Sequence, residues 1–534
     1  MRFLLNICFV ATVAAIGPTL AQDAMEGEAS IPAIEATTPF SEVPTPPGRV
    51  GGLSLRSGNV GLRASGQTGW TDAEVNQPVY TGSAIRTDLR SRAEIRIGAN
   101  TIDLSSGTEI EIASLTDQFT QIAVSRGRIE LRLRQIGADE TVEFDFPQGG
   151  IWLLGPGTYD IDAGGSDQPP RVAVFDGAAR LVGAGGGETP IKGGQMAVLT
   201  TADGASATIE PAASDEFVEW SRRRDYDATR LAALYYVSPY MTGFAELDAA
   251  GIWKISAEYG PVWFPTRSEE WTPYRFGHWS WMAPWGWTWI DDQPWGFAPS
   301  HYGRWALIEE HWAWVPGGFV AHPLYAPAVV AFIGTPGVGL SSQEGAAVAW
   351  FPLAPGEAYW PSYARDVNYV RSLNLGNVQD VETIGMQADG EPPLEVFNAD
   401  FANRQLASVV PRSVFINGRP VAPARLTLPG HRLQNAPVLM GSPQIAPASA
   451  QPVAHAAPTT VPVSRVAVRL SRKGGAKPMI RTASMHPHGH GQPVIIRGAH
   501  LHAPSYAGQP RLRQTIVLRL AHSLRGGAGK GARR

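Results

Sequence analysis

Cysteine is almost missing from this sequence of 534 residues, because Cys8 is the only one. A disulfide scaffold and zinc or redox sites built from cysteine are therefore excluded. Long apolar runs are missing too: after residue 20, no stretch approaches the roughly 18 apolar residues that cross a bilayer. The composition thus excludes a multi-pass membrane protein, and it also excludes a collagen-like chain and a coiled coil.

Acidic residues are missing from the last quarter of the chain. All 48 Asp and Glu lie at or before Asp400, and with 25 Lys and Arg they give residues 1–400 a formal charge of -23. The other 19 Lys and Arg give residues 401–534 a charge of +19. This asymmetry is typical of an acidic folded body with a basic tail. We expect residues 426–534 to be a disordered tail, because Pro, Ala, Gly, Arg and His dominate there.

The composition of this tail predicts weak electrostatic contacts rather than a specific binding site. Counterion release favours binding of a polycation to any polyanion, so anionic envelope polymers or lipid are the expected partners and a specific nucleic acid is not. Alternating histidines in a Gly/Pro context bind copper, nickel or zinc only weakly, and we predict no metal site and no cofactor. The weak metal candidates are His486, His488 and His490.

The N-terminus predicts export. Met1 and Arg2 precede an apolar run from Phe3 to Leu20, and the small residue Ala21 ends it. This pattern is typical of a secretory signal peptide over residues 1–21, with a retained membrane anchor as the alternative. Cleavage would place the chain in the periplasm or at the cell surface, or release it as a secreted protein. Residues 22–48 are rich in proline and predict a linker.

Residues 49–202 alternate between apolar and polar side chains. The segments Ala93–Ile97 and Ile129–Leu133 show this period of two most clearly. Alternation predicts strands with one buried face and one charged face in water. Turn residues at intervals of roughly 8–15 residues favour a sandwich, barrel or stacked β-structure. Residues 212–237 change to a helical period, and Ser214 is the expected N-cap of a linking helix.

Residues 238–425 form a Trp-rich module. Twelve of the 17 Trp lie between Trp253 and Trp314. Phe276–Trp279 recurs 26 residues later as Tyr302–Trp305, which predicts two related hairpins. The predicted fold class is therefore mainly β, with an all-β domain, a linking helix, this β-module and the disordered tail.

The Trp cluster has two interpretations. Indoles two residues apart lie on one face of a strand and can stack on sugars or on an extended polypeptide. The same indoles can face each other and form the core of a small β-module, and alternating positions allow both. The predicted partner-binding residues are Trp279, Trp281, Trp285, Trp287, Trp289, Trp295, Trp305, Trp312 and Trp314.

Two segments carry family resemblances. The text "PVYTGSAIRTDLRSRAEIRIGANTIDLSSGTEIEI" (Pro78–Ile112) and "GRIELRLR" (Gly127–Arg134) resembles the FecR domain. The text "PYRFGHWSWMAPWGWTWIDDQPWGFAPSHYGRW" (Pro273–Trp305), within residues 235–317, resembles the Trp-rich domain DUF6600 of proteobacterial secreted proteins, and Phe401–Phe415 is similar to a later segment of that family. The resemblance implies a periplasmic or surface protein without known catalytic residues. FecR proteins control a sigma factor through a segment in the cytoplasm. We find no such segment before the apolar run, so the resemblance implies only a sensing role.

The predicted function is a non-enzymatic exported envelope protein. Its FecR-like domain would act as a sensor or scaffold that binds a protein partner, and the Trp-rich module would bind protein or glycan. The alternative is a carbohydrate-binding or polysaccharide-hydrolysing wall protein in which Asp292 and Glu309 act as the carboxylate pair. No nucleophile elbow, zinc-binding helix motif or phosphate loop is present.

Overall fold

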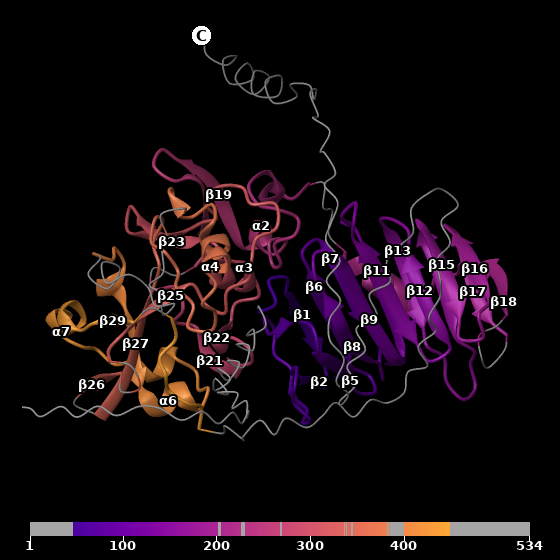
Figure 1. The fold of residues 1–534 in the computed structure, drawn as a ribbon, viewed down its shortest axis with the longest axis horizontal. Coiled ribbons are helices and arrows are strands. Elements are labelled where there is room, and N and C mark those ends of the chain that lie inside the picture. The colour runs from indigo at the N-terminus through magenta and orange to yellow at the C-terminus, as the bar shows by residue number, and fades with distance from the viewer. Residues whose placement is uncertain are drawn as a thin grey trace, which may run out of the picture. The chain divides into compact units, whose positions relative to one another are not determined.

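The structure confirms the predicted fold class. The computed structural model describes residues 46–448, apart from 201–203, 205, 226–229, 268–269, 336, 338, 343–344, 382–383, 385–399 and 440. Over these residues the chain is mainly β with short helices, and all of them belong to one compact unit (Figure 1). The predicted signal peptide and nearly all of the predicted linker lie outside the described residues. No described helix is both long and apolar enough to cross a bilayer.

Two nine-stranded sheets form the first half of the fold (Figure 1). The first sheet has the order β18 (Ala207–Pro211), β17 (Gln195–Leu199), β14 (Arg171–Asp176), β13 (Gly157–Asp162), β10 (Arg128–Leu133), β7 (Asn100–Leu104), β6 (Arg92–Ile97), β1 (Gly51–Ser57), β4 (Pro78–Val79). The second has the order β16 (Glu188–Lys192), β15 (Ala178–Gly183), β12 (Gly149–Leu153), β11 (Thr141–Phe146), β9 (Phe119–Arg126), β8 (Glu109–Leu115), β5 (Ala84–Thr87), β2 (Val60–Arg63), β3 (Thr71–Asp72). The chain crosses repeatedly between the two sheets, which we call the β-sandwich.

Alternating apolar residues fill the space between these sheets. Ile95 and Ile161 from the first sheet and Ile122 and Phe144 from the second belong to one buried cluster. Neighbouring strands are antiparallel, except that β9 and β11 run parallel, with Phe119 opposite Thr141. The period of two therefore places the core as the sequence predicts.

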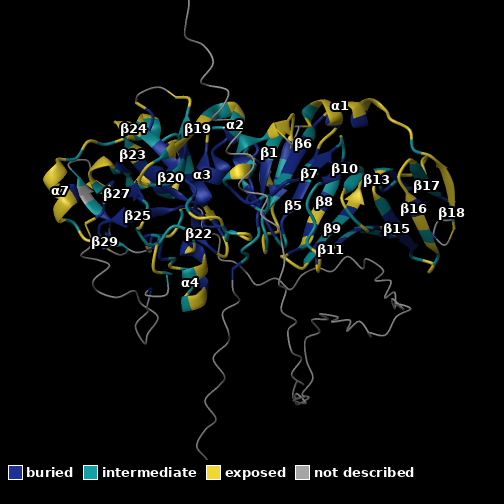
Figure 2. Ribbon diagram, turned by 90° about the horizontal axis from the view of Figure 1, so that it is seen from above, coloured by how far each residue is buried: buried dark blue, intermediate teal, exposed yellow. Residues whose placement is uncertain are grey.

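The charged face of the first sheet differs from the prediction. We expected it to lie in water, but Glu94, Asp103 and Glu130 are each at most 1% exposed. The reason is the helix α1 (Glu216–Arg224), which covers this face, so that Ser221 donates a hydrogen bond to Asp103 (Figure 2). The acids are enclosed between a strand surface and a helix that lies more than 80 residues away in sequence.

The linking helix is also shorter than predicted. It covers Glu216–Arg224 within the predicted range 212–237, and its N-cap is Asp215 rather than Ser214. The Asp215 carboxylate accepts from the backbone N–H groups of Phe217 and Val218 at 3.0 and 3.1 Å, which satisfies two of the free donors of the first turn.

Three smaller sheets form the Trp-rich part. The first has the order β19 (Gly251–Ser256), β20 (Gly260–Pro265), β24 (His311–Val315), β23 (Arg304–Ile308), and the second is the hairpin β21 (Gly277–Met282), β22 (Gly286–Asp291). The third has the order β26 (Leu340–Ser342), β27 (Gly345–Pro352), β25 (Val330–Ile333), β29 (Val438–Leu439), and β28 (Ser408–Pro411) also pairs with β27. The short helices are α2 (Leu247–Ala250), α3 (Phe297–His301), α4 (Val367–Asn374), α6 (Arg412–Ile416) and α7 (Gly430–Asn435), with 3-10 turns η2 (Ala232–Tyr235), η4 (Arg404–Leu406) and η5 (Ala422–Ala424).

The internal repeat corresponds to two hairpins, as predicted. Trp279 pairs with Trp289 across β21 and β22, and Trp305 pairs with Trp314 at the same place in β23 and β24. The first hairpin stands alone as a two-stranded sheet, whereas the second is part of the four-stranded sheet.

The predicted start of the disordered tail at residue 426 is wrong for residues 426–448. Within this stretch β29 pairs with β25, and Trp287 donates its indole N–H to the carbonyl of Ile445 at 2.8 Å. The absence of acids in this segment misled the prediction, because apolar residues such as Leu433 and Val438 still reach the core. Residues 449–534, including His486, His488 and His490, lie outside the described residues.

The β-sandwich and the Trp-rich part share one hydrophobic cluster. Val50 and Tyr80 of the β-sandwich belong to the same cluster as the buried indoles. Tyr80 donates to the carbonyl of Ala283 at 2.5 Å, and the amide of Asn76 donates to the carbonyls of Asp291 and Gln293 at 2.8 and 2.6 Å. The contact is therefore both apolar and hydrogen-bonded.

Candidate binding groove

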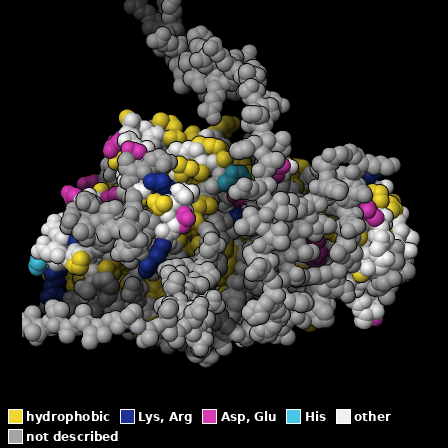
Figure 3. All heavy atoms as spheres, viewed as in Figure 1, with side chains coloured by type: hydrophobic (Ala, Val, Ile, Leu, Met, Phe, Trp, Pro, Cys, Tyr) yellow, Lys and Arg dark blue, Asp and Glu magenta, His cyan; other side chains and the backbone are white. Residues whose placement is uncertain are grey.

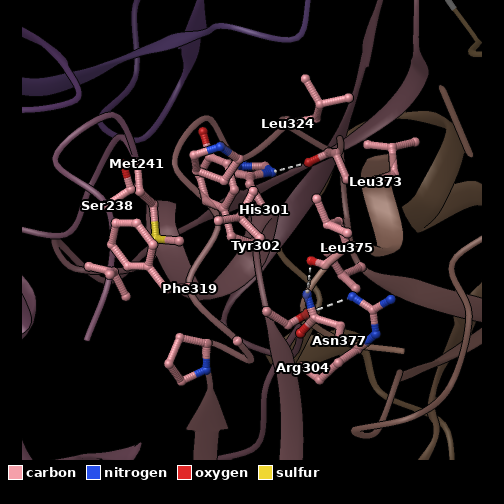
Figure 4. Close-up of a pocket in the computed structure, with 18 of the residues that line it drawn as sticks. Ser238, Met241, His301, Tyr302, Arg304, Phe319, Leu324, Leu373, Leu375 and Asn377 are labelled. Carbon is pink, nitrogen blue, oxygen red and sulfur yellow. Dashed lines mark hydrogen bonds between the residues drawn. The ribbon is translucent and has the colours of Figure 1, made fainter. Parts of the chain in front are cut away.

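A groove opens on the Trp-rich part, and four separate segments form it: residues 236–241, 301–304, 316–329 and 359–377. It encloses about 560 Å³, including space open to solvent, and Figure 4 shows the side chains around it. Because distant segments converge here, the groove depends on the tertiary fold rather than on one local motif.

Apolar side chains form the walls and the mouth of the groove. Met241 and Leu373 are buried in its walls. Phe319 and Leu375 line the same space but are 68% and 47% exposed. Exposed apolar residues at the mouth of an apolar depression are typical of a surface that binds another molecule.

A buried arginine forms part of the wall. Arg304 is 2% exposed, and its guanidinium donates to the carbonyls of Glu357 and Gly303 and to the side-chain oxygen of Asn374, at 2.9, 2.8 and 2.7 Å. All three acceptors are neutral. Burial lowers the pKa of Arg304 to about 10, so the group stays a cation at neutral pH. The groove therefore has a positive charge at its wall.

The histidine of the groove has a structural role. His301 is 1% exposed, and its Nδ1 lies 2.8 Å from the carbonyl oxygen of Ala326. Burial lowers the pKa of His301 to about 3, so the ring is neutral at physiological pH. A neutral, hydrogen-bonded ring holds the segment 323–329 in place rather than supplying a proton.

Two loops at the mouth meet backbone to backbone. Gly318 donates its N–H to the carbonyl of Gly376 at 2.7 Å. Gly376 has a φ of +82°, and a Cβ on it would lie 2.6 Å from the carbonyl oxygen of Gly318. Only glycine combines this conformation with so close an approach.

We expect Gly376→Ala to destabilise the protein by about 2 kcal/mol or more, because it adds both left-handed strain and a backbone clash. Gly356→Ala is the matched control: its φ is +87°, but nothing lies within 4 Å of its would-be Cβ. The control should lose only about 1 kcal/mol through strain. Urea unfolding of the two variants measures the difference, and equal losses would contradict the close contact.

The structure encloses most of the predicted binding indoles. Seven are at most 2% exposed and belong to the shared core cluster: Trp279, Trp285, Trp287, Trp289, Trp295, Trp305 and Trp314. Only Trp281, at 49% exposure, and the half-buried Trp312 are open to a partner. None of the nine lines the groove. For the seven, the structure favours the alternative that the indoles form the core.

A smaller pocket lies beside the core indoles. It encloses about 250 Å³, including open space, and its walls include Trp279, Trp285, Trp287 and Tyr363. The indole N–H of Trp279 is buried without an acceptor among the described residues. A water molecule or a small acceptor group would satisfy it.

The structure does not gather the proposed carboxylate pair in a pocket. Asp292 and Glu309 are both exposed, and neither lines the groove or the smaller pocket. The buried acid is the neighbouring Asp291, which accepts from the indole N–H of Trp289 and the backbone N–H of Gln293, both at 2.9 Å. Burial raises the pKa of Asp291 to about 7. Among the described residues, no three His, Cys, Asp or Glu side chains lie close enough to hold a metal ion.

Edge strand β19 and the turn before it expose apolar side chains. Ile252 and Ile255 of this strand are 61% and 69% exposed, and Tyr235 is 82% exposed. On the face seen in Figure 3, apolar side chains gather over the Trp-rich part. Edge strands with exposed apolar residues are available for pairing with another chain.

Arg304, Phe319 and Leu375 were missed by sequence reasoning. Arg304 occupies the position in the second copy of the internal repeat that His278 occupies in the first. A charged residue next to a Trp was the only feature of the sequence that pointed to Arg304. Nothing in the sequence indicates that residues 319 and 375 meet, because loop contacts follow from the fold.

Comparisons with known proteins give limited matches. No curated protein matches the chain. Two crystal structures of a candidate anti-sigma factor from Parabacteroides distasonis ATCC 8503 are similar to it, each with a TM-score of 0.23. One is 11% identical over 26% of this chain and 64% of that chain, so this chain spans under two thirds of its length. The other is 12% identical over 34% of this chain and 99% of that chain.

The Trp-rich part has a family match. The resemblance predicted for residues 235–317 is confirmed: residues 244–357 match a family of unknown function, DUF6600. The match includes both hairpins, Arg304 and the groove segment 316–329.

Proposed function

We propose that the chain is a non-catalytic exported envelope protein, in which a FecR-like sensing or scaffolding domain is joined to a Trp-rich module that binds a protein partner. The observation that carries this proposal is the groove, with Phe319 and Leu375 exposed at its mouth. The predicted signal peptide supports export, and the alternating strands with their FecR-like sequence support the assignment of the first domain.

The chemistry of the groove favours binding over catalysis. Its histidine is neutral and hydrogen-bonded, and its arginine is held by three acceptors. The Ser238 hydroxyl donates to the carbonyl of Ala321 at 2.5 Å, and no carboxylate lines the groove. A nucleophile with a positioned base, which acyl transfer and hydrolysis require, is therefore missing from its walls.

The walls favour a polypeptide over a glycan. Sugars stack on flat aromatic faces, whereas Met241, Leu324 and Leu373 offer aliphatic surface suited to an apolar side chain. Two exposed aromatic rings favour a carbohydrate instead: Phe319 at the mouth, and Trp281, which does not line the groove.

We expect Phe319→Asp to reduce photocrosslinking of the full chain to its envelope partner at least tenfold. The substitution places a hydrated charge at the mouth without disturbing the core, since Phe319 is 68% exposed. Leu154→Asp, at a similarly exposed apolar residue of the β-sandwich, is the control and should leave crosslinking unchanged. Crosslinking is measured in native envelopes with a photoreactive residue beside the groove.

Two results would contradict this proposal. Undiminished crosslinking in Phe319→Asp, with a loss in Trp281→Ala, would move the binding surface to the exposed indole and favour the glycan alternative. Turnover of wall polysaccharide by the purified chain, abolished in Asp292→Asn, would overturn the non-enzymatic assignment.

A further inference from the structure

The charge of Arg304 has no carboxylate among the described residues in direct contact with it. Of the described arginines, only Arg304 and Arg132 are buried, at 2% and 5% exposure. Arg132 forms ion pairs with Asp103 and Glu130 at 3.0 and 2.9 Å. No carboxylate of a described residue lies within 4.0 Å of Arg304. The Glu357 carboxylate acts on this cation only from beyond that distance. A buried charge without a direct ion pair is unfavourable, and an anion that enters the groove would supply one.

The hydrogen bonds of Arg304 leave donors for such an anion. A guanidinium has five N–H groups, and the three bonds to Glu357, Gly303 and Asn374 use one on Nε and one on each terminal nitrogen. One N–H therefore remains on each terminal nitrogen. Each of these N–H groups can donate to an oxygen of a carboxylate.

An unpaired acceptor lines the same groove. The Asn377 side-chain oxygen is buried and has no hydrogen-bond donor among the described residues. Its amide group makes only a long contact of 3.5 Å with the carbonyl of Leu375. Figure 4 places Asn377 and Arg304 on the same side of the groove. The site thus offers a cation, an N–H acceptor and apolar walls.

We infer that the groove binds the C-terminal end of a partner polypeptide whose last residue is apolar. This inference rests on the proposed function and names its ligand. The terminal carboxylate pairs with Arg304, a backbone N–H of the peptide donates to Asn377, and the last side chain packs between Phe319 and Leu375. A fatty acid would supply the carboxylate and the apolar chain but no N–H for Asn377.

The test compares peptides that differ only at the terminal group. Fluorescein-labelled Gly-Ser-Gly-Ala-Leu is titrated into the full chain as the free acid and as the C-terminal amide, with fluorescence anisotropy as the readout. We expect the amide to bind at least tenfold more weakly, because it loses the pairing with Arg304. Decanoate, added as a competitor, should displace the acid only weakly, since it lacks the N–H donor.

Variants then assign the discrimination to the groove. Arg304→Gln should bind the acid and the amide equally. Because a buried substitution can impair folding, Leu375→Glu and Leu375→Lys provide a second pair at a residue that is 47% exposed. The Glu variant should weaken binding of the acid several-fold and the Lys variant should strengthen it. Leu154→Glu is the matched control and should change nothing.

The outcomes separate this inference from the proposed function. Equal binding of acid and amide, or binding that Leu375→Glu and Leu375→Lys leave unchanged, overturns the inference. The inference is also overturned if decanoate displaces the labelled free-acid peptide at a lower concentration than the unlabelled peptide does. The groove would then bind an acyl chain rather than a polypeptide. If neither peptide binds while Phe319→Asp still reduces envelope crosslinking, the C-terminal ligand is wrong and the proposed function stands. If the crosslinking is also insensitive to Phe319→Asp, both fail.

Discussion

Trp279→Ala is expected to lower the free energy of unfolding by about 3–5 kcal/mol, enough to unfold much of the Trp-rich part at physiological temperature. Trp279 is 1% exposed, and its ring lies 5.2–5.5 Å from the rings of Phe332, Trp289, Trp350 and Phe415. These four rings come from strands β22, β25 and β27 and helix α6. Removing the indole therefore opens a cavity where two sheets and a helix meet.

Trp281→Ala is the matched control on the same strand. Trp281 is two residues further along β21, and it is 49% exposed near the tip of the hairpin. Its loss should lower the free energy of unfolding by less than about 1 kcal/mol. Guanidinium unfolding followed by far-ultraviolet circular dichroism compares the two variants. Similar losses for both would contradict the assignment of Trp279 to the core and would restore the interpretation of these indoles as one binding face.

The difference between these two indoles explains how far the sequence could be interpreted. A period of two places Trp279 and Trp281 on one face of a strand, and the structure agrees. The local sequence does not show how much of this strand face is covered. The cover comes from helix α6 and strand β25, which lie far along the chain. The strands and the hairpin repeat were therefore predictable from local pattern, whereas the exposure of each indole was not.

The charged face of the β-sandwich shows the same limit. Glu94, Asp103 and Glu130 occupy the polar positions of alternating strands, which ordinarily face water. These three acids are buried only because helix α1 packs over them. The charged residues of α1 did not indicate in the sequence that the helix would pack there. Arg222, Arg223 and Arg224 follow one another in sequence, but of these only Arg224 pairs with Glu94, at 2.9 Å. A short helix over a charged sheet is thus a contact that periodicity does not predict.

The groove was the least predictable feature. Its residues lie in four segments, and loops 316–320 and 374–377 are joined by the backbone hydrogen bond from Gly318 to Gly376. The tryptophans, by contrast, form a cluster that the sequence itself shows, because they are close together along the chain. The charge of Arg304 is informative only because no carboxylate of a described residue lies within 4.0 Å of it, and that follows from the tertiary fold.

The stability of the β-sandwich is expected to fall as pH rises from about 5 to 8.5, with Glu130 as a main cause. Glu130 is fully buried; one carboxylate oxygen pairs with Arg132 at 2.9 Å and the other has no donor among the described residues. Burial raises the pKa of Glu130 to about 8, and the opposing effect of Arg132 is smaller. Burial also raises the pKa values of Asp103 and Asp160 to about 6.

The sign follows from proton binding. In the unfolded chain, these acids ionise near pH 4, so between pH 4 and 8 the folded form holds protons that the unfolded form has released. Their stabilisation is complete below pH 4 and is lost as pH rises through the folded pKa values. Arg96, Ser54 and Arg224 beside Glu94 outweigh its burial and lower the pKa of that carboxyl, but its contribution changes only below about pH 4.5. The neutral to alkaline range therefore reports the raised acids.

Glu130→Gln isolates this effect, because the amide keeps a hydrogen bond to Arg132 but does not ionise. We expect wild type and variant to have similar free energies of unfolding at pH 5, and the variant to be more stable by on the order of 3 kcal/mol at pH 8.5. Urea unfolding at several pH values measures the slope, and Glu111→Gln, at an exposed surface ion pair, should follow the wild-type curve. An unchanged slope in Glu130→Gln would mean that Glu130 is ionised in the folded protein. Arg132 would then hold an ionised Glu130 as well as Asp103 and Asp225, and Arg132→Met, rather than pH, would be the change that releases the helix.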